Sequence, residues 1–286
     1  MANNILSAIS NIVSFGNYNL NSYSSTYLIR INAVGEQLEF YIKDAIAGSF
    51  KLPQDKKEEA YARIFSYLGN QNNPPDMIIK NSDAFEIKKI ESPMSSLALN
   101  SSPPKNKLLS NDIRITNACR NCEAHKWAEK DLFYVIGHAV GGEIKYLFFI
   151  HGLCYAADYS VYEKVYSPIK SDVDSIIGGL GLEKGETDEI GKVKRVDPLG
   201  ITELRIRGMW QIQNPLKVYG DLCKIEDADK FHLFALIRAD KYKSFPKEDR
   251  DKLETGKSIS VREVRIKDPN NPAKLIKAKL ISFKER

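Results

Sequence analysis

Two apolar segments in the middle of the chain, residues 132–139 and 144–152, constrain the fold more than any other feature. Both are rich in β-branched and aromatic residues, and Gly141 and Gly142 lie between them. Runs of this length, bounded by turn residues, predict strands that are buried on both faces. Such strands need helices or further strands to cover them. We therefore expect an α/β fold with a mixed central β-sheet flanked by helices.

Helical spacing of apolar residues precedes these strands. Residues 5–13 predict a short N-terminal helix, and a second helix is expected from about Val34, where apolar side chains recur at intervals of three and four and Glu39 lies among them. A third helix is predicted over residues 56–68, with Gly69 as its C-terminal cap. Toward the other end, residues 161–177 have a mixed pattern that is compatible with a helix.

The overall composition excludes several classes of protein. The net charge is +5, from 42 Lys and Arg against 37 Asp and Glu, which permits a polyanionic partner without establishing one. No apolar stretch approaches the roughly 18 to 20 residues of a membrane span, and the N-terminus lacks the pattern of a signal peptide. Four cysteines do not form a disulfide framework in a chain of 286 residues. We expect a cytoplasmic protein with reduced thiols and no membrane partner.

A second pair of short strands carries charged side chains. Residues 77–80 and 84–90 are joined by Asn81-Ser82-Asp83, and Asp76 follows two prolines at the start of the pair. Side chains alternate along a strand, so Glu86 and Lys88 share one face while Ile87 points into the core. If the hairpin forms, Asp76 comes close to Glu86. The pattern thus predicts two carboxylates and one ammonium in a small site.

This set of groups suits the hydrolysis of a phosphodiester. Divalent cations held by carboxylates neutralise the scissile phosphate and favour hydroxide at neutral pH, and Mg²⁺ prefers oxygen ligands and retains waters. We expect Asp76 and Glu86, with the Ile87 carbonyl, to bind Mg²⁺, and Lys88 to position or activate the attacking water. The alternative for a Glu-x-Lys pair is a solvated ion pair on an exposed strand. The helical Glu39 upstream and the polar segment 92–111 downstream favour the catalytic interpretation.

Several stretches of the chain also resemble NgoPII-type restriction endonucleases of the PD-(D/E)XK superfamily. The most specific is Glu86-Ile87-Lys88-Lys89-Ile90-Glu91-Ser92, followed by residues 97–102. The others are residues 35–44, 65–70, 73–76, 118–123 and 127–131. The resemblance is strong over residues 30–165 and too weak to use beyond them.

The resemblance implies a type II restriction enzyme that uses Mg²⁺ to cut double-stranded DNA at a short palindrome, GGCC in that family. It assigns catalysis to Asp76, Glu86 and Lys88, with Glu39 as an auxiliary. A palindrome cut on both strands implies a two-fold homodimer, and a cognate methyltransferase would share the target site without needing to bind the enzyme. We expect a single domain over residues 1–286, with the catalytic core at about 30–165 and residues 166–286 contributing DNA recognition.

Two groups of side chains are candidates for contact with DNA. Basic side chains that follow the hairpin are expected to hold phosphates: Lys105, Lys107, Arg114 and Arg120. Side chains on one face of a strand predicted over residues 203–213 are expected to read bases, because Arg and Gln pair with base edges in the major groove: Arg205, Arg207, Gln211 and Gln213. The alternative for the second group is the solvated face of an ordinary edge strand.

Cys119, Cys122 and His125 have the spacing of half a zinc site, which would need a further ligand from residues such as His138, His151 or Cys154. We interpret these cysteines as structural. Two other classes of function stay open. One is a different PD-(D/E)XK nuclease, such as a repair or junction-resolving enzyme. The other is a DNA-binding or zinc-stabilised module without catalysis.

Overall fold

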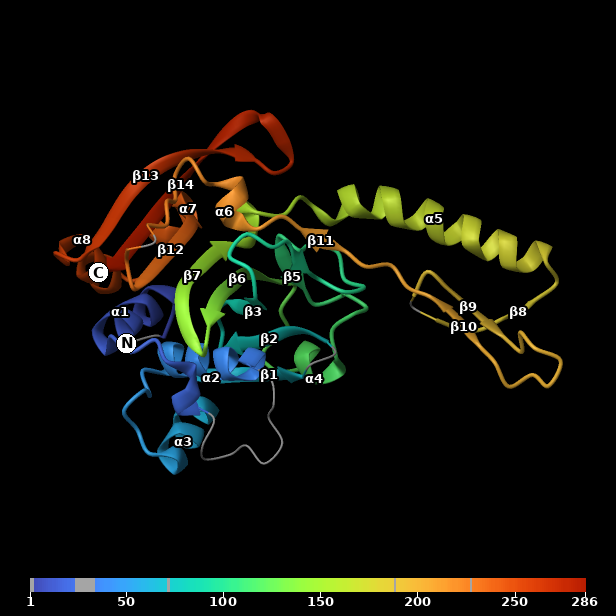
Figure 1. The fold of residues 1–286 in the computed structure, drawn as a ribbon, viewed down its shortest axis with the longest axis horizontal. Coiled ribbons are helices and arrows are strands. Elements are labelled where there is room, and N and C mark those ends of the chain that lie inside the picture. Colours follow the sequence, from blue (N-terminus) through green and yellow to red (C-terminus); the bar gives the residue numbers. More distant parts are fainter. Residues whose placement is uncertain (1–2, 24–33, 71–72, 188, 227) are drawn as a thin grey trace. The chain divides into compact units, whose positions relative to one another are not determined.

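The computed structural model describes residues 3–23, 34–70, 73–187, 189–226 and 228–286 (Figure 1). The chain divides into two compact units. The first, here called the sheet unit, consists of residues 1–95, 106–156 and 214–286. The second, here called the insert unit, consists of residues 96–105 and 157–213. The expectation of a single domain stays a prediction.

A mixed β-sheet forms the centre of the sheet unit (Figure 1). Within the described residues it has nine strands in the order β1-β2-β3-β6-β7-β12-β14-β13, with β5 added beside β6. Strand β3 pairs with β6 in parallel, as does β7 with β12, and the other pairs are antiparallel. The strands are β1 (Phe65–Asn70), β2 (Asn73–Ile79), β3 (Ala84–Ile90), β5 (Lys107–Leu109), β6 (Glu129–Val140), β7 (Glu143–His151), β12 (Phe231–Arg238), β13 (Ile259–Asp268) and β14 (Asn271–Glu285). The predicted α/β fold with a mixed central sheet is confirmed.

Helices α1 and α2 cover one face of this sheet. Helix α1 (Ile5–Phe15) begins at a capping box in which Asn4 accepts from the Ser7 amide and Ser7 accepts from the Asn4 amide, and it ends at Gly16, whose φ is +61°. Helix α2 is Val34–Ala47, as predicted. The remaining helices of the unit are α3 (Gln54–Ile64), α4 (Asn117–Arg120), α6 (Pro215–Val218), α7 (Ala239–Ser244), α8 (Lys247–Thr255) and the 3-10 turns Leu20–Tyr23 and Gly152–Cys154.

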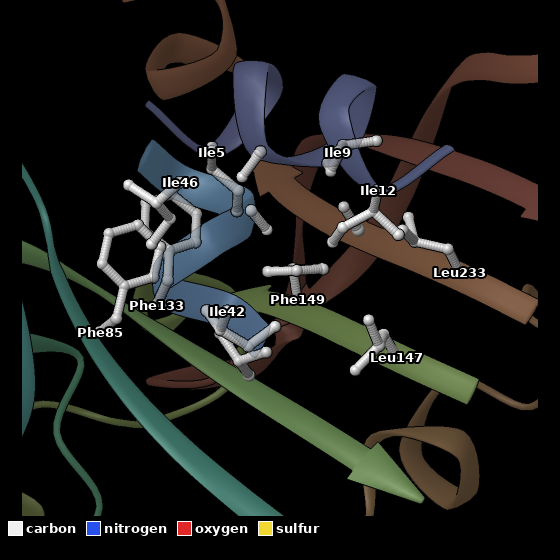
Figure 2. Close-up of a cluster of buried hydrophobic side chains, with 14 of the residues drawn as sticks. Ile5, Ile9, Ile12, Ile42, Ile46, Phe85, Phe133, Leu147, Phe149 and Leu233 are labelled. Atoms are coloured by element: carbon white, nitrogen blue, oxygen red, sulfur yellow. The ribbon is translucent and has the colours of Figure 1, made fainter. Parts of the chain in front are cut away.

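The main core lies between these two helices and the central strands (Figure 2). Figure 2 shows Ile5, Ile9, Ile12, Ile42 and Ile46 from the helices packed over Phe85, Phe133, Leu147, Phe149 and Leu233 from the strands. Gly137 of β6 lies where α2 approaches the sheet, and a Cβ there would be only 2.6 Å from the Leu38 Cδ2 atom. The missing side chain lets α2, which carries Glu39, pack closely against the sheet.

The prediction of a helix over residues 56–68 is wrong at its C-terminal end. Helix α3 ends at Ile64, and Phe65–Asn70 is the edge strand β1, paired with β2 through Phe65↔Ile79 and Leu68↔Met77. The charged residues that precede residue 65 have helical spacing, but backbone pairing with β2 overrides any continuation of it. Gly69 is therefore a strand residue and does not cap the helix.

The described part of the insert unit contains one long helix and two small sheets. Helix α5 (Tyr159–Gly179) packs Val173 and Ile177 against β9, where Gly191 has no side chain to separate them. The two small sheets are β10-β9-β8, from Leu204–Ile206, Gly191–Lys194 and Glu183–Lys184, and β11-β4, from Gln211–Ile212 and Leu97–Ala98. The single strand predicted over residues 203–213 is thus two short strands. No helix in the described ranges has the length and hydropathy needed to cross a membrane.

Candidate active site

The predicted hairpin is confirmed, and it opens at Asp76. Strands β2 and β3 pair in antiparallel register through Ile78↔Ala84 and Met77↔Phe85. At the next position, Asp76, a side-chain oxygen accepts the hydrogen bond from the neighbouring strand: the Ile87 N–H donates to Asp76 Oδ2 at 2.5 Å. The peptide bond between the two prolines before Asp76 is cis. The hydrogen bond from the Ile87 N–H holds the Asp76 carboxylate against the middle of β3.

Glu86 and Lys88 lie on the same face of β3, as the period of a strand requires. Lys88 Nζ donates to Glu86 Oε1 at 2.6 Å, and both side chains are mostly buried. Ile87 between them belongs to the main core. The second carboxylate oxygen, Glu86 Oε2, is buried and has no hydrogen-bond partner among the described residues. A buried carboxylate oxygen without a donor favours a bound cation or donor.

Burial of two carboxylates side by side raises the pKa of Asp76 to about 8. Loss of solvent contributes most and the charge of Glu86 next, while Lys88 and the Ile87 N–H act in the opposite direction. A divalent cation between Asp76 and Glu86 would compensate both the burial and the repulsion. The assignment of this pair as a cation site stays a prediction.

Lys88 keeps its charge in this environment. Burial by itself lowers the pKa of Lys88, but the neighbouring carboxylates of Glu86 and Asp76 outweigh it, so the pKa is raised above its usual value. The side chain is therefore an ammonium at neutral pH. Such a group can donate hydrogen bonds to a water or a phosphate oxygen.

Helix α2 adds two charged side chains to the site. Burial raises the pKa of Glu39, which also interacts electrostatically with Lys88 and Glu86. Burial lowers the pKa of Lys43, one turn further along, against the opposing effect of Glu39 and Asp76. Lys43 was not predicted as a site residue. Its spacing of four residues from Glu39, which places both on one helix face, is the sequence signal that indicates it.

Gly69 of β1 supports the backbone that carries Asp76. A Cβ at position 69 would lie 2.3 Å from the Pro75 carbonyl oxygen and 3.1 Å from Asp76 Cα. The two strands can approach this closely only because residue 69 has no side chain. No local pattern indicates this role, because the contact depends on how β1 pairs with β2.

The oxygen ligands at the site match those that Mg²⁺ needs. Among the described residues no three His, Cys, Asp or Glu side chains are grouped so that they could hold a metal. Asp76 and Glu86 supply two carboxylates, and Mg²⁺ is commonly bound by one or two carboxylates together with waters and substrate phosphates. The pair therefore fits Mg²⁺ and does not fit an ion that requires several protein ligands.

Cys119 and Cys122 lie in a separate, structural environment. Cys119 is buried in α4, and burial raises the pKa of its thiol to about 12. Burial also raises the pKa of Cys122. Among the described residues, neither cysteine belongs to a group of three or more His, Cys, Asp or Glu side chains that could hold a metal. Beside them, Glu123 forms a buried ion pair with Lys130 at 2.7 Å and accepts from the Asn81 amide and Ser66, which ties this loop to β1 and to the turn of the hairpin.

Of the four predicted phosphate contacts, three lie in the sheet unit and have intramolecular partners. Lys107 pairs with Glu129, Arg114 lies 3.9 Å from Asp112, and Arg120 donates to the Ser110 carbonyl at 2.7 Å and to the Asp112 carbonyl at 3.1 Å. Lys105 lies in the insert unit and is buried. The contact of these four side chains with DNA stays a prediction.

The predicted base-reading face lies in the insert unit. Exposure alternates as expected from Arg205 to Gln213, with every second side chain exposed. Arg205 and Arg207 both pair with Glu189, at 2.8 and 2.7 Å, while Gln211 is exposed on β11. The assignment of base contacts to this face stays a prediction.

These features together define a class of protein. A mixed sheet with an opened hairpin brings together a Pro-Asp on one strand and a Glu-x-Lys on the next, with a Glu on the preceding helix. That is the arrangement expected of a PD-(D/E)XK nuclease, in which carboxylates and a lysine act on a phosphodiester.

Comparison with known proteins identifies the family. The model of the family described as NgoPII restriction endonuclease matches residues 3–268. The chain is also 41% identical over 281 residues to the type II restriction enzyme NgoPII of Neisseria gonorrhoeae, an alignment that covers 98% of this chain and 99% of that enzyme. The chain belongs to the NgoPII restriction endonuclease family and is a type II restriction enzyme, a site-specific deoxyribonuclease. No solved structure matches it.

Proposed function

We propose that this enzyme hydrolyses double-stranded DNA at a short palindrome with Mg²⁺ held by Asp76, Glu86 and the Ile87 carbonyl. The family resemblance suggests GGCC as the palindrome. The observation that carries the proposal is the buried Glu86 Oε2, without a donor among the described side chains, beside the buried Asp76. Bound there, Mg²⁺ would bring positive charge to the scissile phosphate and favour hydroxide at neutral pH.

In the proposed reaction, water adds to phosphorus and the bond to the 3′ oxygen breaks, which leaves a 5′-phosphate and a 3′-hydroxyl. Lys88 carries its proton at neutral pH because its pKa is raised. It therefore orients the attacking water and stabilises the charge that develops on the phosphate, and does not act as the proton acceptor. Glu39 is the auxiliary carboxylate, held beside the site by α2.

A palindrome presents the same bases to each half of a two-fold dimer, so we propose a homodimer in which each copy cuts one strand. Phosphate contacts are assigned to Lys107, Arg114 and Arg120, with Lys105 from the insert unit. Base contacts are assigned to the exposed face that contains Arg205, Arg207, Gln211 and Gln213. Ion pairs within the protein, such as those of Arg207 and Lys107, would have to exchange for contacts with DNA. The proposed location is the cytoplasm, where the enzyme meets duplex DNA.

The test compares cleavage of plasmid DNA by the wild type and by three variants, Asp76→Asn, Glu86→Gln and Lys88→Met, at saturating Mg²⁺. Each variant is expected to lose at least about a hundredfold in the cleavage rate. Glu91→Gln is the matched control, because Glu91 is an exposed carboxylate just after the same strand. Sequencing the fragment ends identifies the target. Full activity of Asp76→Asn or Lys88→Met would refute the assignment, and cutting confined to branched DNA would indicate a junction-resolving enzyme.

A further inference from the structure

Helix α5 of the insert unit carries a stripe of exposed aliphatic side chains. Val161, Val165, Ile169 and Ile176 recur at intervals of four and seven residues, which places them along one side of the helix. Val165 is 54% exposed and Ile176 is 62% exposed. The helix contains Pro168, directly before Ile169. A row of exposed aliphatic side chains along one helix is uncommon on a protein surface without a partner.

The insert unit's own sheets pack against other residues of this helix. The side of α5 next to the stripe packs Tyr162 edge-to-face on Trp210, with ring centroids 5.6 Å apart, and places Val173 and Ile177 against β9. Two charges on that side are also used within the unit: Lys170 donates to the Thr187 carbonyl, and Asp174 pairs with Lys184 at 2.6 Å. The helix is therefore anchored along one side, and the exposed stripe lies next to that side.

We infer that the stripe is the contact between two copies of this chain, with the two α5 helices antiparallel across a two-fold axis near Ile169. This inference rests on the proposed function, which needs two active sites for one palindrome. Val161 lies eight residues before Ile169 and Ile176 lies seven after it. Reversing the helix therefore places Val161 of one copy opposite Ile176 of the other, and Ile169 close to its own symmetry mate. The contact has the self-complementarity that a two-fold interface requires.

The exposed charges along the stripe fit the same arrangement. Lys164 precedes Ile169 and Asp172 follows it, and both side chains are exposed. In the antiparallel pair, Lys164 of one copy comes beside Asp172 of the other, and the symmetry forms this pair twice. A parallel pair would instead leave Lys164 of one copy eight residues along the helix from Asp172 of the other, which is about 12 Å at about 1.5 Å per residue, so this pair would not form. The charges thus favour the antiparallel orientation.

The size of the contact sets its strength. Val161 and Ile176 are fifteen residues apart, which spans about 22 Å of helix at about 1.5 Å per residue. Two helices in contact over this length bury less than the roughly 1,200–2,000 Å² of a standard stable interface. The dimer is therefore expected to be weak in the free protein and to be strengthened by duplex DNA with a palindromic site, which binds both copies at once.

The first experiment is sedimentation of the full chain over a range of concentrations, with and without a duplex that carries the target. The wild type is expected to approach twice the monomer mass of 32.3 kDa. Ile169→Glu is expected to raise the dimer dissociation constant by more than about tenfold, because it places two carboxylates together at the axis. Ser171→Glu, an equal change of charge on an exposed residue outside the stripe, is the matched control and is expected to leave the constant unchanged.

The second experiment exchanges the charges. Lys164→Glu and Asp172→Lys are each expected to weaken the dimer by about fivefold, and the double variant is expected to restore it. A wild type that stays monomeric on its target duplex would overturn the inference, as would an Ile169→Glu protein that dimerises normally. Reduced DNA affinity of Ile169→Glu without a change of association state would assign the stripe to DNA instead. Absence of Mg²⁺-dependent cleavage would refute the proposed function alone, since sedimentation does not depend on catalysis.

Discussion

Replacement of Gly69 by alanine tests whether the close approach of β1 and β2 positions Asp76, the carboxylate that we propose to be catalytic. The added Cβ would lie 2.3 Å from the Pro75 carbonyl oxygen and 3.1 Å from Asp76 Cα. Ordinary carbon–oxygen contacts are no closer than about 3.3 Å. The strands must therefore separate by about 1 Å at this point. Both sides of the contact are backbone, so no change of rotamer relieves it.

A shift of this size acts directly on the site. It lengthens the 2.5 Å hydrogen bond from the Ile87 N–H to Asp76 Oδ2 and moves the carboxylate away from Glu86. A displacement of about 1 Å at a catalytic group costs about a hundredfold in rate. Overpacking itself costs about 1–3 kcal/mol of unfolding free energy, which corresponds to roughly 2–12 °C in Tm for a protein of this size. The variant is thus expected to fold and to cut poorly.

The assay is single-turnover cleavage of a duplex at increasing Mg²⁺, with thermal unfolding as a check of folding. Gly69→Ala is expected to lower the maximal rate and to raise the Mg²⁺ concentration at half-maximal rate, while DNA binding without divalent cation stays near the wild-type value. Gly178→Ala is the control, because no atom lies within 4 Å of its added Cβ. A folded Gly69→Ala enzyme with wild-type rate and wild-type Mg²⁺ dependence would show that Gly69 does not position Asp76.

Three further predictions follow from the electrostatics. Because the pKa of Asp76 is about 8 and a metal ligand must be deprotonated, the Mg²⁺ concentration at half-maximal cleavage should fall as pH rises from about 6.5 to 8.5; a pH-independent value in a Mg²⁺ titration would contradict this. The raised pKa also means that the stability contributed by Asp76 is fully present below pH 4 and is lost as the pH rises through 8. Asp76→Asn should therefore raise the Tm of the metal-free protein at pH 8, by an amount that shrinks toward pH 5. Equal Tm values of the two proteins at pH 8 would refute the raised pKa of Asp76. Glu123→Gln should lower the free energy of unfolding in urea by about 3–5 kcal/mol, because it leaves the buried Lys130 without its charged partner. A loss below about 1 kcal/mol would show that solvent reaches the ion pair.

The strands that carry the site were predictable because their signals are local. The apolar runs that became β6 and β7 and the turn residues 81–83 need no tertiary information to be identified. Once the hairpin is assigned, the period of a strand places Glu86 and Lys88 on one face. The family resemblance then indicates the activity, and the comparisons confirm it.

Other features depend on contacts between distant segments. The boundary between α3 and β1 is decided by pairing with β2, so local spacing extended the helix too far. Strand β12 was not predicted, although residues 231–238 are apolar, and its parallel pairing with β7 joins segments far apart in the sequence. The role of Gly69 likewise depends on a neighbouring strand that the sequence does not specify.

The order of strands has a consequence for how the enzyme is made. Strand β7 lies between β6, which precedes it directly, and β12, which the ribosome completes only after the whole insert unit. Until residues 231–238 emerge, the backbone groups along one edge of the apolar strand β7 have no neighbouring strand to pair with. Such an edge promotes association between nascent chains. A host that stops translation early therefore produces a fragment that holds the Asp76 hairpin in an incomplete sheet. Full synthesis of the C-terminal strands is then a condition for a stable nuclease.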